Sequence, residues 1–181
     1  MRPALLLFLL ALATPAAAQP HHHRHGATPP APGSQPYAGM EQRRIKALSA
    51  REAEDLLAGR GMALALAAEL NGYPGPMHVL EHAEALRLTP DQRARAEAIR
   101  AAMLVEARSL GARIVAMEEE LDALFAREQA DAGRLGALTA ALGAMQGRVR
   151  EAHLAAHIAM RAALTAEQRQ AYARLRGYAA R

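Results

Sequence analysis

The second half of this chain contains no proline. Pro90 is the last one, and the 91 residues that follow it (91–181) can form long helices, because a proline inside a helix ends or kinks it. Two stripes of apolar residues follow at steps of three and four, which is the spacing of one helix face. The first stripe comprises Ile99, Met103, Ala107, Leu110, Ile114, Met117, Leu121 and Leu124, and the second comprises Leu135, Leu138, Leu142, Met145, Val149, Ala152, Ala156 and Met160. A polar break at 128–131 separates the stripes and predicts a tight reversal of the chain.

Short local motifs mark where helices begin. The segments 89–92 (Thr-Pro-Asp-Gln) and 165–168 (Thr-Ala-Glu-Gln) each place a threonine before the helix and a glutamine at its third position, the pattern of a capping box. Ser49 and Glu52 form a third box ahead of a shorter segment. These motifs predict a long helix over 90–128, its partner after the reversal, and a last helix that Gly177 ends.

The patterns together predict an all-α fold, a long antiparallel helical hairpin with short flanking helices. The abundance of alanine and the scarcity of valine, isoleucine and threonine agree with that class. Gly136, Gly143 and Gly147 cost about 1 kcal/mol each inside a helix, and we expect them to allow a neighbouring helix to approach closely. A single hairpin has a thin core, so we expect a homodimer.

The first 18 residues have the layout of a secretory signal peptide. Arg2 supplies a positive start, an uncharged apolar run covers 4–13, and three alanines at 16–18 precede the expected cleavage before Gln19. The run is too short to span a bilayer, which needs about 20 apolar residues. A short buried helix is the alternative. We therefore expect a periplasmic protein, with no membrane span after cleavage and, because cysteine is absent, no lipid anchor.

Residues 19–39 are rich in proline and predict a disordered arm. The arm carries a histidine cluster, which either captures a transition metal loosely or is an ordinary solvated tract. The cluster comprises His21, His22, His23 and His25. The remaining regions are the short helices of 40–75 and the hairpin domain of 76–177.

The four other histidines fall in two pairs, His78 with His82 and His153 with His157. In each pair the imidazoles lie four residues apart, on one helix face, where they can chelate one ion. Met160 continues the second stripe. If the hairpin reverses near residue 130, both pairs lie near its open end, within roughly 10 Å along the axis, so that they could share an ion.

The intervening helix would add Glu106, which falls best between the pairs, with Glu97 and Met103 nearby. The donor set suits zinc, nickel, cobalt or copper and does not choose among them. Two alternatives remain open, namely histidines at the edge of an amphipathic seam and a pH switch without metal.

Other function classes find no support in the sequence. The formal charge of +4 and the 3% aromatic content do not indicate nucleic-acid binding. With no cysteine, no phosphate-binding glycine loop and only three serines, the chain offers no catalytic constellation, and we do not expect an enzyme.

The two capping motifs extend to a longer repeat, Leu-Thr-x-x-Gln, formed by Leu88, Thr89 and Gln92 and again by Leu164, Thr165 and Gln168. By themselves these residues need only cap helices and pack the leucines. Two such motifs at the ends of a helical hairpin, behind a signal peptide, resemble the periplasmic LTxxQ family of Spy, CpxP, ZraP and CnrX-type proteins. The resemblance covers roughly 76–177.

That resemblance implies one of several roles. Its branches are chaperones that hold unfolded clients without ATP, zinc-linked chaperones, and nickel or cobalt sensors. The first histidine pair matches the H-x-x-x-H element of the sensors. The second pair departs from their H-x-x-x-M, and the sensor carboxylate falls near Arg100, so that Glu97 or Glu106 would have to replace it. We expect a periplasmic heavy-metal-binding protein for sensing or resistance. The alternative is a Spy/CpxP-type chaperone, and the partners would be unfolded clients or a membrane-bound regulator.

Overall fold

The computed structural model describes residues 35–178. The chain divides into two units, Met1–Pro36 and Tyr37–Arg181, and every helix of the described residues belongs to the second. The predicted signal peptide, the four histidines at 21–25 and most of the predicted arm lie outside the described residues. Within them no helix has both the length and the apolar character that a membrane crossing requires.

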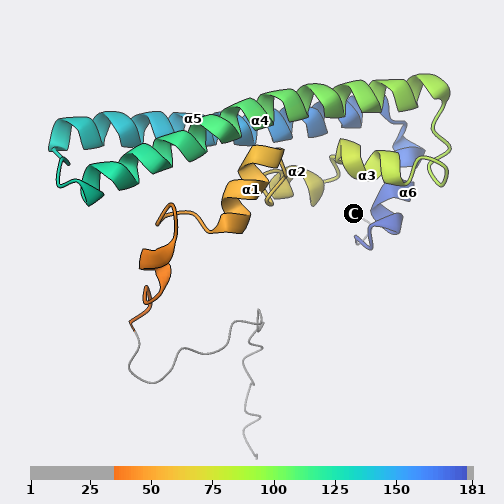
Figure 1. Ribbon diagram of the computed structural model, residues 1–181. Coiled ribbons are helices and arrows are strands. Elements are labelled where there is room, and N and C mark those ends of the chain that lie inside the picture. The colour runs from red at the N-terminus through yellow and green to blue at the C-terminus, as the bar shows by residue number, and fades with distance from the viewer. Residues whose placement is uncertain (1–34, 179–181) are drawn as a thin grey trace, which may run out of the picture. The chain divides into compact units, whose positions relative to one another are not determined.

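Two long helices, α4 (Pro90–Ala126) and α5 (Ala132–Ala163), form the predicted antiparallel pair (Figure 1). Thr89 caps α4 through a capping box with Gln92, and Asp131 caps α5 by accepting from the amides of its second and third residues. The reversal at 127–131 includes one left-handed residue, Glu128. The predicted all-α class and the long hairpin are confirmed, whereas the homodimer stays a prediction.

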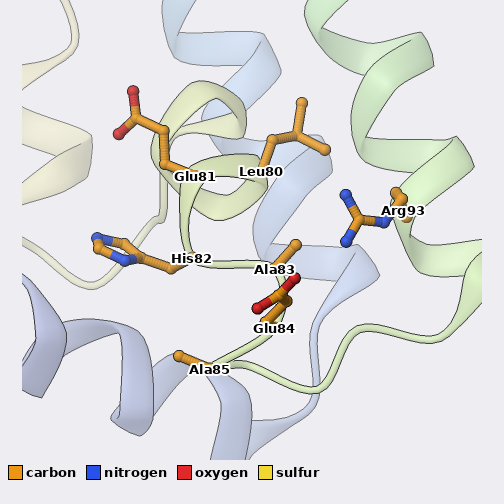
Figure 2. Close-up of a pocket in the computed structure, with 7 residues that line it drawn as sticks. All are labelled: Leu80, Glu81, His82, Ala83, Glu84, Ala85 and Arg93. Carbon is orange, nitrogen blue, oxygen red and sulfur yellow. The ribbon is translucent and has the colours of Figure 1, made fainter.

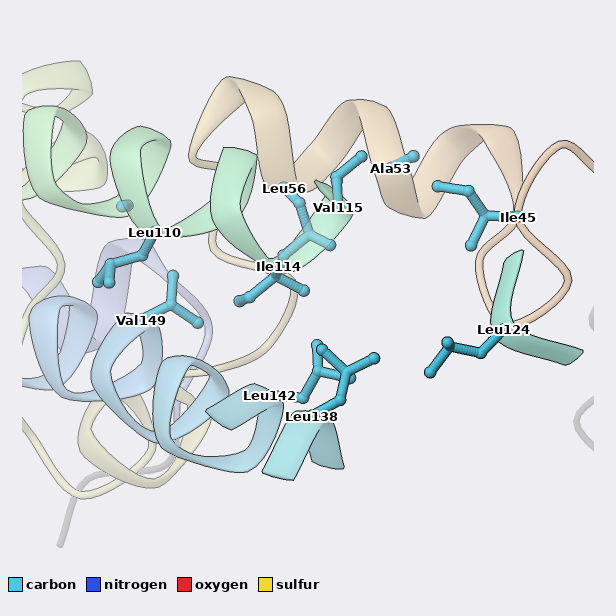
Figure 3. Packing of buried hydrophobic residues seen from close by; sticks show 11 residues of the cluster. Ile45, Ala53, Leu56, Leu110, Ile114, Val115, Leu124, Leu138, Leu142 and Val149 are labelled. Carbon is cyan, nitrogen blue, oxygen red and sulfur yellow. The ribbon is translucent and has the colours of Figure 1, made fainter. Parts of the chain in front are cut away.

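The short helix α1 (Ala50–Ala58) packs across α4 and completes the larger apolar cluster. Ser49 and Glu52 cap α1 with the expected box. Figure 3 shows Leu56 of α1 beside Ile114 and Val115 of α4, with Leu142 of α5 opposite. The cluster therefore has three sides, since α1 adds its own apolar residues to the two stripes of the hairpin.

Glycine allows a close helix approach at one position that differs from those predicted. A Cβ atom added at Gly111 would overlap the backbone carbonyl of Leu56, so glycine is required where α1 crosses α4. At Gly136, Gly143 and Gly147 an added Cβ would meet no atom of the described chain within 4 Å. The prediction that these three glycines permit a close approach is therefore wrong within this chain, because α1 packs on α4 and leaves that face of α5 uncovered.

A second apolar cluster holds the open end of the hairpin together. There α3 (Pro76–Glu81) and α6 (Ala166–Leu175) lie at the ends of α4 and α5, whereas α2 (Leu66–Glu69) lies between α1 and α3 and contacts α5 (Figure 1). Val79, Met160 and Tyr172 are its buried centre. A short 3-10 helix, η1 (Met40–Gln42), precedes α1. The helix α3 ends at Glu81, where the chain turns, and a left-handed residue at Arg87 precedes α4.

Candidate functional site

The repeated Leu-Thr-x-x-Gln motifs begin α4 and α6, as the sequence predicts. Each threonine hydroxyl accepts from the backbone amide of its glutamine, at 3.1 Å for Thr89 and 3.2 Å for Thr165. Leu164 is buried and Leu88 half-buried in the second apolar cluster. The glutamines do more than cap, because the Nε2 of Gln92 donates to the carbonyl of Ala163 at 3.0 Å and that of Gln168 to the carbonyl of Leu86 at 3.2 Å.

The histidine pair of α5 faces inward. His157 holds its Nδ1 2.7 Å from the carbonyl oxygen of Tyr73. Because a carbonyl only accepts, Nδ1 carries the hydrogen in the neutral ring, which leaves the lone pair on Nε2. His153, one turn earlier, is 3% exposed, and its Nε2 has no hydrogen-bond partner in the described part of the chain. Burial, followed by the charge of His157, lowers the pKa of His153.

Glu69 of α2 is the carboxylate next to this pair, and sequence analysis missed it. It is only 9% exposed, and its Oε2 lies 3.6 Å from Nδ1 of His157 and accepts from the amide of Gly75 at 3.1 Å. Gly75 lets the turn before α3 lie on the imidazole, since an added Cβ would come within 3.1 Å of Nε2 of His157.

The second oxygen of Glu69 faces the C-terminal helix. Oε1 accepts from the hydroxyl of Tyr172 at 2.5 Å and of Tyr178 at 2.9 Å, and lies 3.6 Å from Nε of Arg176. Burial, together with the bond to Glu69, raises the pKa of Tyr172 above its ordinary range. One buried carboxylate thus connects α2, α5 and the end of α6.

The α3 pair, with His78 inside α3 and His82 directly after its last residue, is nearer the surface. His78 shares a 2.8 Å contact between its Nδ1 and the carboxylate of Glu81, and this hydrogen bond is the main cause of the lowered pKa of Glu81. The charges of Arg176 and His82 lower it further. His82 lines a hollow of about 310 Å³, with Glu84 and Arg93 on its other sides (Figure 2). Arg176 also lies 3.6 Å from Glu69, so its charge acts on a carboxylate beside each histidine pair.

The structure does not gather all the predicted ligands at one point. Across residues 35–178, no three histidine, aspartate or glutamate side chains are arranged to hold a metal ion. Glu106 is exposed and lies 3.6 Å from Arg148, and Glu97 is exposed as well. Met160 is fully buried within the second apolar cluster. The shared four-histidine site therefore stays a prediction, and Glu69 and Glu81 are the carboxylates found beside the imidazoles.

Comparison with known proteins supports a metal-related role. Residues 56–171 match the model of a family described as heavy-metal resistance. The match begins within α1, 20 residues before the segment that carries the LTxxQ resemblance, so that it includes α2 and Glu69. No curated protein and no solved structure gives a significant match. Because the family model covers more than half of the 181 residues, the chain belongs to the heavy-metal resistance family.

Proposed function

We propose that this protein is an exported heavy-metal-binding protein whose primary site is the α5 pair, His153 and His157. The observation that carries the proposal is the state of the two imidazoles. His157 has its Nδ1 engaged by a backbone carbonyl, and His153 has a buried Nε2 with no partner among the described residues. Metal-bound histidines are typically held as His157 is, with the second ring nitrogen donating to a carbonyl or carboxylate.

Glu69 supplies the third donor in this proposal. Its Oε2 lies 3.6 Å from Nδ1 of His157, and to act as a ligand its side chain would have to change rotamer and carry an oxygen to the Nε2 side of the rings. Two imidazoles and a carboxylate suit zinc, nickel or cobalt. In this proposal the bound ion acts as a signal or is sequestered, and it takes part in no reaction. The α3 pair, with Nδ1 of His78 held by Glu81, is a second and more exposed position for an ion.

Calorimetric titration tests this assignment. The full chain, with the four histidines at 21–25 changed to alanine to remove background binding, is titrated with zinc, nickel, cobalt and copper(II) salts. We expect at least micromolar affinity for one of these ions. The double variant His153→Ala/His157→Ala should weaken it at least tenfold, and the matched control His78→Ala/His82→Ala should keep it. Uptake that depends only on the α3 pair, or no uptake, overturns the proposal.

Export is a separate part of the proposal. It rests on the layout of residues 1–18, and it requires the mature chain to begin at Gln19. The intact mass of the protein recovered from the periplasm of an expressing bacterium checks the cleavage site. A full-length chain retained in the cytoplasm would contradict it.

A chaperone function is the second candidate, and one surface feature favours it. Residues 57–77 leave several large apolar side chains exposed, as a client-holding surface would require. They are Leu57, Met62, Leu66, Leu70 and Met77. Equimolar protein should then suppress the aggregation of a chemically unfolded client without metal, and Leu66→Ser/Leu70→Ser should reduce the suppression. Equal aggregation with and without the protein excludes this function.

A further inference from the structure

Besides packing in the second apolar cluster, the helix α6 makes polar contacts at both of its ends, with Gln92 and with Glu69. Gln92 contacts Gln168 at the beginning of α6. At the other end, Glu69 contacts the side chains of Tyr172, Arg176 and Tyr178. Tyr172 is the buried residue of α6, and its hydroxyl donates to Glu69, so the contacts with Glu69 add to the apolar attachment of the last two turns.

The two carboxylate oxygens of Glu69 contact different parts of the protein. Oε1 takes the three groups from α6 and the residues that follow it, whereas Oε2 faces the Gly75 amide and His157. The described residues hold no ready-made set of three ligands, so a side chain must move before the α5 pair can bind an ion with a carboxylate. Glu69 is the carboxylate nearest that pair, with Oε2 3.6 Å from Nδ1 of His157. Turning it toward the Nε2 atoms would take Oε1 away from the two tyrosine hydroxyls.

We infer that Glu69 is a latch: metal binding at His153 and His157 and docking of α6 compete for its carboxylate, so that occupancy of the site loosens the C-terminal helix. The inference rests on the proposed function and says how metal binding at that site would change the attachment of α6. A buried tyrosine hydroxyl that loses its hydrogen-bond acceptor costs free energy, so metal binding and docking of α6 oppose each other. The apolar face under α6, including Val79 and Met160, would then open more often.

Hydrogen exchange of the backbone amides tests the latch. The full-length protein, with the histidines at 21–25 replaced by alanine, is followed by mass spectrometry with and without the ion that calorimetry finds to bind. We expect the amides of 166–175 to exchange about tenfold faster with metal, while those around Ile114 and Val149 stay unchanged, because local opening leaves the centre of the hairpin intact.

Two variants separate the latch from a general loss of stability. Tyr172→Phe keeps the ring in the apolar cluster and removes one bond to Glu69, so α6 should exchange faster without metal and metal affinity should not fall. Arg148→Ala, on the exposed part of α5, should change neither readout.

The outcomes are distinguishable. Calorimetry without heat for any of the four ions overturns both the proposed function and the latch. Measurable binding with unchanged or slower exchange of α6 overturns the latch alone. Faster exchange along α4 and α5 as well would show a global effect and also overturns it.

Discussion

The side chains of Gln92 and Gln168 donate to each other, and both Nε2–Oε1 distances are 2.9 Å. Each Oε1 also accepts from the backbone amide of the threonine in its own motif, at 3.1 Å for Thr89 and 2.9 Å for Thr165. The repeated glutamine therefore has two tasks, since it caps its own helix and joins the beginning of α4 to the beginning of α6.

This pairing predicts that Gln92→Glu destabilises the protein although glutamate is a good capping residue. A carboxylate still accepts from Thr89, but it cannot donate to Ala163 or to Gln168. The loss of two half-buried donors should lower the free energy of unfolding by roughly 1–3 kcal/mol, measured by urea denaturation at pH 7.5.

Glu52→Gln is the control for that variant, because it makes the reverse exchange of oxygen and nitrogen at the same position of the exposed box of α1. Its acceptor role toward the amide of Ser49 survives, so the expected change is within about 0.5 kcal/mol. Equal effects of the two substitutions would contradict a linking role for Gln92.

Two glycine-to-alanine substitutions should change the free energy of unfolding in opposite directions. Gly111→Ala forces a methyl group into the carbonyl of Leu56 and should cost about 1–3 kcal/mol as α1 is pushed off α4. Gly143→Ala adds a methyl group to open space and should stabilise the folded chain by about 0.5–1 kcal/mol. Urea denaturation of both variants measures the difference. A destabilising Gly143→Ala would show that another chain covers this face of α5, as the predicted homodimer allows.

Buried His153 predicts a loss of stability on mild acidification in metal-free buffer. Its pKa is lowered in the folded chain, so below the ordinary value of about 6.5 the unfolded chain takes up a proton that the folded chain refuses. The stabilising contribution is complete above pH 6.5 and is lost as the pH falls toward the folded pKa. Comparison of the unfolding free energies at pH 7.5 and pH 5.5 measures this loss.

His153→Leu should remove much of that pH dependence, whereas His82→Ala should keep it. Glu52, Glu81 and Glu167 also have lowered pKa values, but their contribution is lost only below about pH 4.5, outside this window. An unchanged slope in His153→Leu would show that another group controls the response.

Local features of the fold could be predicted from the sequence, and features that depend on distant contacts could not. Thr89 and Gln92 mark a helix start with atoms three residues apart, and the proline-free stripes determine the hairpin. Which glycine lies under α1 depends on how α1 crosses α4, which no short pattern encodes. Glu69 and Tyr172 meet across 103 positions, so sequence spacing does not relate the α2 carboxylate to α6.

The two candidate carboxylates, Glu106 and Glu69, give the clearest test of where a metal binds. Sequence spacing places Glu106 between the histidine pairs, but in the structure it is exposed and lies beside Arg148, an arrangement worth at most about 1 kcal/mol. Glu106→Ala should therefore leave metal affinity within about twofold, whereas Glu69→Ala should weaken it at least tenfold, because loss of one carboxylate ligand costs more than about 1.4 kcal/mol. Calorimetry on both variants, with circular dichroism to confirm the helical content, measures the ranking. A larger loss of affinity in Glu106→Ala than in Glu69→Ala would instead place the ion where the hairpin spacing predicts, between α4 and both histidine pairs.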